Sequence, residues 1–489
     1  MSDRKTPSKA SGLSAVPVVA LAAGDGIGPE ISQAVISILE ASGAELHFDH
    51  LAIGLQAYKD GHAGGIPEAA WEQIEAADVI LKAPITTPSG GGVKSLNVSL
   101  RKRLGLAVNL RPCRSYAPYV QTRHPLMDLV IVRENEEDLY AGIEYQQSQQ
   151  SVQAVKLITR PGCERVIRYA FDYARANGHK KVTALVKDNI MKMSDGMFWD
   201  IFQATAKQYP DLENERLIVD IGMARVADTP EDFEVIVCQN LYGDILSDIT
   251  AQLSGSVGMC GSANLGEQHA MFEAIHGSAP DLAGTDKANP SGMLQAACLM
   301  LEYLGDNQQA KLIQNAWLAT LEQGIHTIDL ESELTTQTVG TQQFAAAVIR
   351  NLGSIPSQMK PARSAAQQVK VLPAPQPIRG SHRQLAGVDV FIHHHGPVTE
   401  LAETLQSLSG NLTLSSIACR GAAVWPQQSP QALLNDQLCA RMMHPEQQAS
   451  PEDSASLLVA MNEAGIEFVG TQHLYLLNGQ PGWTALQGD

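Results

Sequence analysis

The stretch Asn240-Leu-Tyr-Gly-Asp-Ile-Leu-Ser-Asp248 follows the short apolar run Phe233 to Cys238, and this order predicts a strand that leads into a helix. On that helix Asp244 and Asp248 lie four residues apart and share one face. Like charges at this spacing repel each other, so the pair favours a cation between the carboxylates, and oxygen ligands suit Mg²⁺ or Mn²⁺. A solvated acidic helix face is the ordinary alternative unless other residues converge on the same site.

Polar side chains follow other apolar runs in the same way. Lys187 and Asn189 come after the run 182–186, and Asp220 comes after the run 217–219. Each run predicts a strand, and open α/β sheets build their sites at the carboxyl ends of their strands. The pattern therefore predicts an α/β enzyme whose site draws on several strand ends.

Three arginines, Arg101, Arg111 and Arg133, also stand just past apolar runs. Each alone is explained as a surface arginine, but together they could clamp a polycarboxylate by bidentate pairing. Ser95 and Asn97 lie just before Arg101 and add hydrogen-bonding groups. The net charge of −17 argues against nucleic-acid binding, so an anionic substrate would need such a local cluster.

A glycine-rich turn, Gly24-Asp-Gly-Ile-Gly-Pro-Glu30, separates the apolar run 16–22 from a helical pattern. Its spacing is not Gly-x-Gly-x-x-Gly, so it does not predict a Rossmann unit, and a purely structural tight turn is the alternative. Farther along, Thr86 and Thr87 follow another predicted strand, where they could bind a ligand or cap the loop.

The loop His276-Gly-Ser-Ala-Pro-Asp-Leu-Ala-Gly284 is rich in small residues and is followed by Asn289 and a long amphipathic helix. Exposed backbone amides in such a loop are suited to cradle a nucleotide. A structural histidine is the alternative explanation for His276.

The totals indicate a soluble enzyme of several domains. A chain of 489 residues exceeds one ordinary domain, and its seven cysteines are scattered without a Cys-x-x-Cys pair. We therefore expect free thiols and a cytoplasmic location, because disulfides are rare in reducing compartments. The chain has no apolar run of membrane-spanning length and no segment resembling a secretion signal, and the first ~15 residues predict a polar tail.

The C-terminal part predicts a separate module. Residues 352–380 are rich in proline, serine and glutamine and predict a linker. Residues 381–489 predict a strand, a helix, two strands, a helix and a strand, with a further strand possible near 438–442. This β-α-β-β-α-β order is typical of ferredoxin-like or ACT-like α+β domains. His393 to His395 alternate between faces of a strand, which disfavours a metal site there.

Several segments together resemble one known family, the β-decarboxylating dehydrogenases that act on isocitrate or isopropylmalate. The resemblance rests on Ser95-x-Asn97-x-x-x-Arg101, on Lys187-x-Asn189 and on the remaining segments 24–30, 133–140, 240–248, 276–280 and 289–290. The full length is similar to the bacterial branch that carries a C-terminal extension. The resemblance implies a two-domain α/β/α sandwich, distinct from a Rossmann fold, with a large cofactor domain (16–108 and 255–351) and a small substrate and dimer domain with a clasp (109–254).

The resemblance also implies roles for individual residues in a homodimer with shared active sites. It implies that Asp244 and Asp248 hold Mg²⁺ or Mn²⁺ together with Asp220 of the second subunit, and that Tyr140 and the second subunit's Lys187 transfer protons. The implied residues for the tricarboxylate are Ser95, Asn97, Arg101, Arg111 and Arg133. Those for the dinucleotide are Thr86, Thr87, Asn189, His276, Gly277, Ala279, Asp281, Leu282 and Asn289.

Substrate and cofactor need separate arguments. Ser95 and Asn97 favour isocitrate over a substrate with a branched alkyl group. NADP-dependent members carry Lys-Tyr where this chain has Asp281 and Leu282, and a carboxylate would repel a 2′-phosphate, so we expect NAD, unless Asp281 only caps a helix. The alternatives are an NADP enzyme, a homoisocitrate or isopropylmalate dehydrogenase, and a non-catalytic regulatory subunit. Phosphorylation of Ser95 would block an anionic substrate, and the C-terminal module either stabilises the dimer or senses a ligand.

Overall fold

The computed structural model describes residues 16–62, 64–88, 95–362, 369–373, 375, 382–427 and 433–485. The chain forms two compact units: a main unit, Met1–Ala141 with Leu157–Pro375, and a C-terminal unit, Gly142–Lys156 with Gln376–Asp489. The expected polar tail and part of the expected linker lie outside the described residues. Within the described ranges, no helix is both long and apolar enough to cross a membrane.

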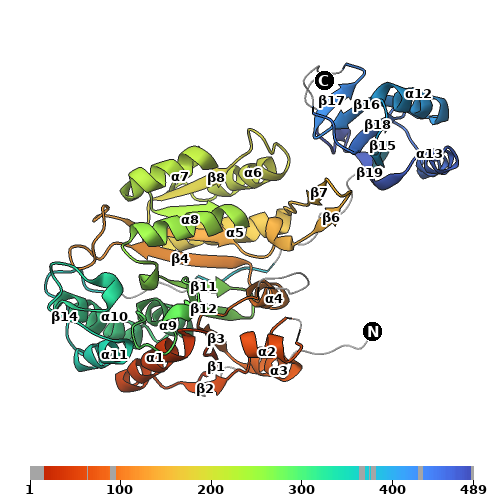
Figure 1. Ribbon diagram of the computed structural model, residues 1–489. Coiled ribbons are helices and arrows are strands. Elements are labelled where there is room, and N and C mark those ends of the chain that lie inside the picture. Colours follow the sequence, from red (N-terminus) through yellow and green to blue (C-terminus); the bar gives the residue numbers. More distant parts are fainter. Residues whose placement is uncertain are drawn as a thin grey trace. The chain divides into compact units, whose positions relative to one another are not determined.

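A ten-stranded mixed sheet forms the centre of the main unit (Figure 1). Its middle strands, from β12 through β11 and β4 to β5, pair antiparallel, and the strands on either side pair parallel. In spatial order the strands are β2 (His47–His50), β1 (Val18–Ala22), β3 (Val79–Lys82), β12 (Ala270–Ala274), β11 (Gly261–Leu265), β4 (Val108–Arg114), β5 (Asp128–Glu134), β10 (Val235–Cys238), β8 (Lys181–Val186) and β9 (Glu213–Ile218).

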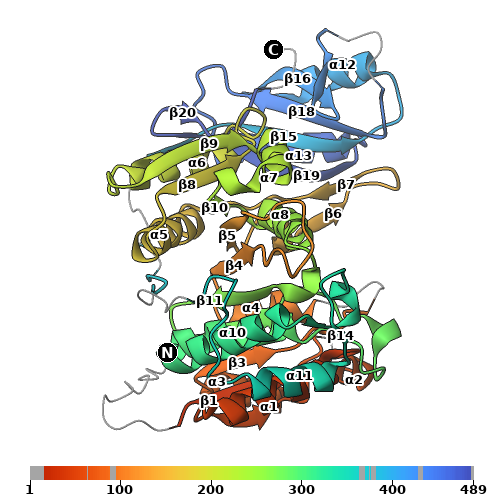
Figure 2. The ribbon, with the colours of Figure 1, turned by 90° about the vertical axis from the view of Figure 1, so that its left-hand side faces the viewer.

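Both faces of this sheet are buried. Successive residues of a strand point to opposite faces, so one strand contributes to two cores. On β1, Val19 and Leu21 join one apolar core, whereas Ala20 and Ala22 join another. Helices cover the sheet, and Figure 2 shows α1, α10 and α11 gathered near β1 and β3. The main-unit helices are α1 (Gly28–Ser42), α2 (Leu55–Lys59), α3 (Glu68–Ala76), α4 (Leu96–Arg103), α5 (Arg160–Ala176), α6 (Ser194–Ala206), α7 (Val219–Asp228), α8 (Asn240–Leu253), α9 (Ser291–Leu304), α10 (Asn307–Glu322) and α11 (Thr341–Arg350). The predicted three-layer α/β architecture is confirmed.

The glycine turn before α1 packs tightly against the loop that follows β12. Gly26 has φ +60°, and a Cβ there would lie 2.0 Å from the Ser278 carbonyl oxygen. Between the glycines, the Asp25 carboxylate accepts hydrogen bonds from the backbone N–H groups of Leu55 and Thr86. The glycine turn therefore contacts the loop at Thr86 and the loop at Ser278, and both loops contain residues predicted to bind the dinucleotide.

The C-terminal unit has a six-stranded antiparallel sheet in the order β17-β16-β18-β15-β19-β20 and its own apolar core. The strands and helices in chain order are β15 (Arg383–His393), α12 (Val398–Leu408), β16 (Thr413–Cys419), β17 (Ala422–Trp425), β18 (Gln437–Met443), α13 (Pro451–Glu463), β19 (Phe468–Leu477) and β20 (Gln480–Pro481). The predicted ferredoxin-like order is present, with one change. The strand that pairs with β15 is β18, whereas β17 only extends the edge beside β16.

A hairpin of β6 (Glu144–Gln146) and β7 (Val152–Ala154) belongs to the C-terminal unit. Its turn is fixed by side chains, because Ser148 Oγ donates to Asp436 Oδ1 over 2.8 Å and Asn435 Nδ2 donates to Ser151 Oγ over 2.7 Å. The division expected from the sequence places this hairpin in the small domain, 109–254, whereas the structure groups it with the C-terminal unit.

Candidate active site

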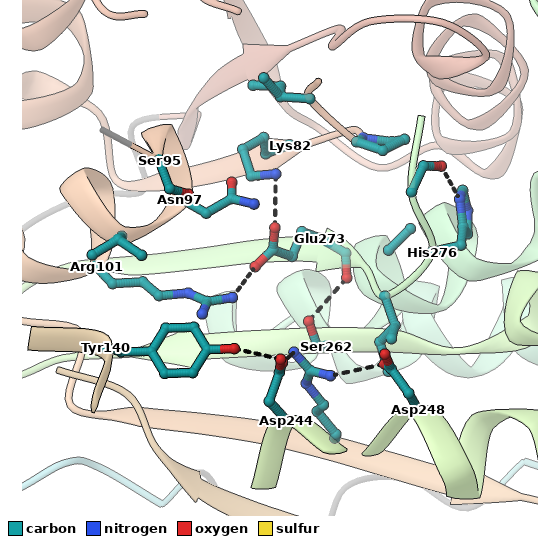
Figure 3. Close-up of a pocket in the computed structure, with 17 residues that line it drawn as sticks. Lys82, Ser95, Asn97, Arg101, Tyr140, Asp244, Asp248, Ser262, Glu273 and His276 are labelled. Atoms are coloured by element: carbon teal, nitrogen blue, oxygen red, sulfur yellow. Dashed lines mark hydrogen bonds and ion pairs between the residues drawn. The ribbon is translucent and has the colours of Figure 1, made fainter. Parts of the chain in front are cut away.

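A polar cavity of about 270 Å³ lies in the main unit and gathers most of the residues predicted to bind the substrate and the metal (Figure 3). Helices α4 and α8, strands β4 and β11, and the C-terminal ends of β3 and β12 contribute side chains to it. The predicted residues that line it are Ser95, Asn97, Arg101, Arg111, Tyr140, Asp244, Asp248, His276 and Gly277.

Helix α8 presents its two aspartates to this cavity, as the four-residue spacing predicts. Asp244 accepts hydrogen bonds from the Arg133 guanidinium and from the Tyr140 hydroxyl. Arg111 Nη2 lies 3.7 Å from Asp244, and its Nη1 lies 3.9 Å from Asp248. Asp244 is therefore set against two arginines, whereas Asp248 is largely exposed and lies near one of them.

The carboxylates differ in their ease of ionisation. Burial opposes ionisation of Asp244, but Arg133 and the Tyr140 hydroxyl more than offset it and lower its pKa. Burial and the neighbouring Asp244 raise the pKa of Asp248, although Arg111 opposes them. Burial and the bond to Asp244 raise the pKa of Tyr140, so its proton is retained.

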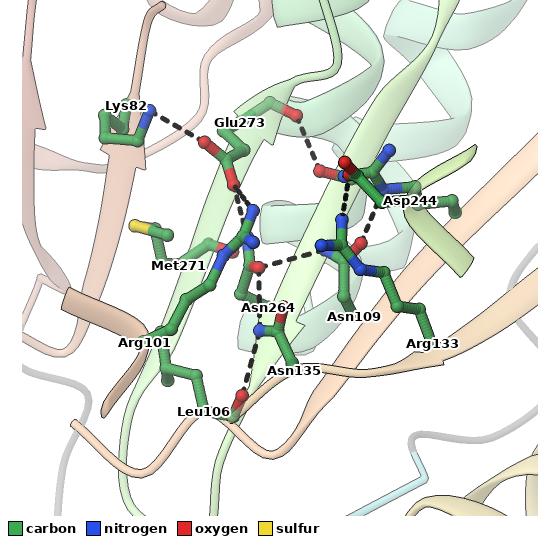
Figure 4. A network of polar contacts seen from close by, with 12 residues as sticks. Lys82, Arg101, Leu106, Asn109, Arg133, Asn135, Asp244, Asn264, Met271 and Glu273 are labelled. Carbon is green, nitrogen blue, oxygen red and sulfur yellow. Dashed lines mark hydrogen bonds and ion pairs between the residues drawn. The ribbon is translucent and has the colours of Figure 1, made fainter. Parts of the chain in front are cut away.

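A buried ion-pair network forms the opposite wall of the cavity (Figure 4). The Glu273 carboxylate on β12 lies 2.7 Å from Lys82 Nζ and 3.2 Å from Arg101 Nη2. It also accepts a hydrogen bond from Asn264 Nδ2 over 2.8 Å. Burial alone would raise the pKa of Glu273, but Lys82 and Arg101 hold it well below its usual range. Sequence reasoning overlooked Lys82 and Glu273, although a charged residue inside an otherwise apolar strand was a signal that could have found them.

The loop after β12 closes one side of the cavity. His276 Nδ1 lies 3.0 Å from the Gly277 carbonyl oxygen, and burial lowers the pKa of the ring, which favours neutral imidazole. Within the described residues, His276 Nε2 and Asn97 Oδ1 are buried without a hydrogen-bond partner. Both residues line the cavity, where a bound ligand could provide the missing partners.

Other residues predicted for the dinucleotide have varied positions. Thr86 Oγ1 lies 2.7 Å from Ser278 Oγ, and Ala279 takes a left-handed conformation at φ 38°. The Asn289 amide is engaged within the chain, donating to Asp329 Oδ2 over 3.0 Å and accepting from the Ser291 N–H over 2.9 Å. Thr87, Asp281 and Leu282 are exposed.

Lys187 and Asp220 lie together elsewhere in the main unit. Lys187 Nζ is 2.7 Å from Asp220 Oδ1, which lowers the pKa of Asp220, and Asn189 is exposed nearby in the chain. The described residues that line the cavity include none of these three. Their predicted role at the site of a second copy stays a prediction.

The oxygen donors at the cavity suit a hard cation such as Mg²⁺ or Mn²⁺. Of the carboxylates that line the cavity, Glu273 is paired with Lys82 and Arg101, which leaves Asp244 and Asp248 for a metal. In the described part of the chain no group of three acidic, histidine or cysteine side chains is placed to hold a metal. A divalent ion would therefore need further ligands from the substrate or from a second copy.

Comparisons with known proteins agree with this arrangement. Residues 18–348 match the family model "Isocitrate/isopropylmalate dehydrogenase", and residues 383–489 match "Bacterial isocitrate dehydrogenase, C-terminal domain". A Rickettsia felis protein named "Isocitrate dehydrogenase [NADP]" is 45% identical over 96% of this chain and 99% of its own length. A Thermus thermophilus protein of the same name is 38% identical over 95% of each chain. The crystal structure of a Thermus thermophilus protein designated TT0538 superposes with a TM-score of 0.90, at 38% identity over 96% of both chains.

These names correct the expected cofactor. The preference for NAD was predicted from Asp281, but the Rickettsia and Thermus relatives, which cover nearly the whole chain, are named for NADP. Asp281 lies exposed in the short helix Pro280–Leu282. Because water and salt screen a charge at such a position, one carboxylate there does not exclude a 2′-phosphate.

Proposed function

Because the chain belongs to the isocitrate/isopropylmalate dehydrogenase family, we propose that it oxidises and decarboxylates isocitrate with NADP. The products would be 2-oxoglutarate, CO₂ and NADPH. The names of relatives that cover almost the whole chain support both substrate and cofactor.

The net charge of the cavity is the observation that supports isocitrate as the substrate. Three cationic side chains line the cavity, Lys82, Arg101 and Arg111. Arg133 does not line it but is buried behind Asp244 and pairs with that carboxylate. Set against Glu273 and the α8 aspartates, these four cations leave one positive charge. A divalent ion would raise the local charge to about three, which balances a tricarboxylate rather than a dicarboxylate.

The cavity also offers polar groups for a distal carboxylate. Ser95 stands just before α4 and does not use its side chain to cap the helix, and Asn97 has a buried oxygen without a partner among the described residues. An isopropylmalate site would need an apolar surface at this position. These residues would hold isocitrate through hydrogen bonds and orient its C2–H bond toward the nicotinamide.

Proton transfer would rest on Tyr140 and on a second copy of the chain. Tyr140 keeps its proton beside Asp244 and could donate it to the enolate that forms when CO₂ leaves. Asp244 and Asp248 would hold Mg²⁺ or Mn²⁺, which when bound supplies Lewis-acid polarisation of the ketone oxygen. Asp220 and Lys187 would complete the site from the second subunit of a homodimer.

A comparison of initial rates tests this proposal. Isocitrate, 3-isopropylmalate and homoisocitrate would each be assayed with NADP and with NAD in the presence of Mg²⁺. The expected result is the highest kcat/KM for isocitrate with NADP. A higher kcat/KM for 3-isopropylmalate would contradict the substrate, and equal or higher efficiency with NAD would contradict the cofactor.

A non-catalytic regulatory subunit is the other class of function considered. Such a subunit would be expected to lack one or more groups of the site. Here Arg101, Arg111, Tyr140 and both α8 aspartates line the cavity, and Arg133 supports Asp244 from behind. Measurable turnover by the purified chain alone would exclude that alternative.

A further inference from the structure

Two cysteines face each other across neighbouring strands beside the active site. Strands β4 and β11 pair antiparallel, with Leu110 opposite Ala263 and Asn109 opposite Asn264. Continuing this register by three residues places Cys113 opposite Cys260, the residue just before β11. Pro112 lacks an N–H group and so cannot extend the ladder of hydrogen bonds to that position.

The side chains of this pair lie on the sheet face that carries the active site. Residues two apart on a strand share a face, so Asn109, Arg111 and Cys113 point the same way. The facing side chains do meet, since Asn109 Nδ2 donates to Asn264 Oδ1 over 2.9 Å. The cysteine pair thus continues a row whose preceding members, Arg111 and Ser262, line the cavity.

The two thiols are buried, and each shifts the pKa of the other. Cys113 is 0% exposed and Cys260 is 4% exposed. The hydrogen bond from the Cys113 thiol to Cys260 raises the pKa of Cys113 and lowers that of Cys260. Thr250 Oγ1 donates to Cys113 Sγ over 3.2 Å, and Ser254 Oγ lies 3.6 Å from Cys260 Sγ, so both sulfurs also touch the end of α8.

We propose that Cys113 and Cys260 form a reversible disulfide that lowers the turnover of this enzyme. Directly opposed residues in antiparallel strands have Cα atoms about 4.5–5.5 Å apart, which lies within the range that a disulfide spans. In a reducing compartment such bonds are usually transient and sense oxidants. The predicted cytoplasmic location therefore fits a regulatory bond rather than a permanent one.

The chemistry needs a hydroperoxide as the oxidant. The sulfur of Cys260 attacks one oxygen, the O–O bond breaks, and Cys260 becomes a sulfenic acid as the alcohol or water leaves. The sulfur of Cys113 then attacks the sulfenic sulfur, forms the S–S bond and releases water. The two thiols lose two electrons, the peroxide gains them, and a dithiol reverses the reaction.

The bond would act on catalysis through its neighbours. Closing the bond brings the sulfurs to about 2.05 Å, nearer than hydrogen-bonded thiols, and so pulls β4 toward the start of β11. Arg111 lies two residues before Cys113, and Thr250 lies two residues after Asp248 on α8. A small displacement of either group would misplace the substrate or the carboxylates, and a shift of about 1 Å can cost 10²-fold in rate.

Peroxide treatment of the full-length enzyme, followed by peptide mapping without reduction, tests the bond directly. The expected result is a linked peptide pair containing Cys113 and Cys260, together with a fall in activity of about tenfold or more that dithiothreitol reverses. Mapping needs no variant, so a folding defect cannot obscure it. Failure to find the linked pair would overturn the proposal.

Three variants test the link to activity. Cys113→Ser and Cys260→Ser should keep their activity in peroxide, whereas Cys163→Ser, which removes another buried cysteine, should respond as the wild type does. Equal inactivation of all three would overturn the claim of regulation, as would a linked wild-type enzyme with full activity. The loss of turnover rests on the proposed function, but the linked peptide does not, so the two failures remain distinguishable.

Discussion

Asp244 is the residue on which the polar contacts of the cavity converge. It accepts hydrogen bonds from Arg133 and Tyr140 and lies 3.7 Å from Arg111. An amide at this position would keep the volume but lose the charge that balances the arginines. These contacts assign Asp244 to the site. The four-residue helix spacing alone does not, because it also fits a solvated helix face.

We predict that Asp244→Asn lowers kcat for isocitrate by about 10²–10³-fold or more, because a carboxylate that would hold the metal and orient Tyr140 is lost. Steady-state kinetics and a thermal unfolding curve would be measured together. The matched control is Glu72→Gln, the same type of exchange at an exposed position on α3, which should retain wild-type rates. Normal turnover in Asp244→Asn would overturn the assignment.

Glu134, at the end of β5, provides a prediction about pH. Burial, with the neighbouring Glu137, raises the pKa of Glu134 to about 8. In the unfolded chain a glutamate ionises near pH ~4.3, so the native state holds an extra proton between these values. This group therefore contributes stability at low pH that is lost as pH rises through about 8.

The variant Glu134→Gln cannot ionise, and its amide oxygen can accept the same hydrogen bond from the Glu136 N–H. We predict that its stability relative to the wild type is greater at pH 8.5 than at pH 5. Urea unfolding midpoints of both proteins at the two pH values provide the measurement. A difference between the proteins that is the same at both pH values would show that Glu134 ionises normally.

Single residues also mark the limit of sequence reasoning about the site. Arg101, Arg111 and Asp244 could be singled out because each follows an apolar run or shares a helix spacing, although Arg101 lies within α4 and Arg111 within β4 rather than at the end of a strand. The sequence analysis missed Lys82 and Glu273, although a charged residue inside an apolar run is unusual. The run alone does not identify the partner of either charge, and the pairing of β3 with β12 shows that the two neutralise each other. Asp281 shows the opposite error. The sequence analysis assigned its charge the role of selecting NAD, but an exposed carboxylate does not by itself exclude the 2′-phosphate of NADP.

At the scale of elements, the packing of α8 against β5 sets the position of Arg133. Gly243 allows this approach, because a Cβ there would lie 2.5 Å from Arg133 Cγ. We predict that Gly243→Ala destabilises the protein by about 1–3 kcal/mol and raises KM for isocitrate, since Arg133 must move. Chemical unfolding and steady-state kinetics measure the two effects.

The control for this change is Gly196→Ala in α6, where a Cβ would meet no atom within 4 Å. Alanine is favoured over glycine inside a helix, so this variant should be as stable as the wild type or more stable, with unchanged KM. Equal behaviour of the two variants would mean that helix propensity, rather than contact with Arg133, decides the effect.

The C-terminal sheet shows why element order is easier to predict than strand pairing. The sequence placed the two strands after α12 correctly, but it treated 422–425 as a principal strand and 438–442 as optional. In the sheet, β18 pairs with both β15 and β16, whereas β17 pairs only with β16. Local patterns identify strands, but long-range pairing decides which of them is central.

At the scale of the whole molecule, the separation of Lys187 and Asp220 from the cavity lining leads to a prediction about assembly. If two copies share each active site, mixing two inactive variants should restore activity. We predict that Asp244→Asn and Lys187→Met, denatured and refolded together, recover about a quarter of wild-type activity, because half of random dimers would be mixed and each would hold one intact site. Recovery no greater than that of either variant refolded alone would indicate that each chain completes its own site.

The most direct test of the proposed function is the stoichiometry of the purified enzyme's reaction with isocitrate, NADP and Mg²⁺. NADPH would be followed by absorbance, 2-oxoglutarate by an enzymatic assay and CO₂ by trapping of isotope-labelled gas. We predict equal amounts of all three products and loss of all three in Asp244→Asn. NADPH formation without CO₂, or no reaction with isocitrate, would contradict the proposed oxidative decarboxylation.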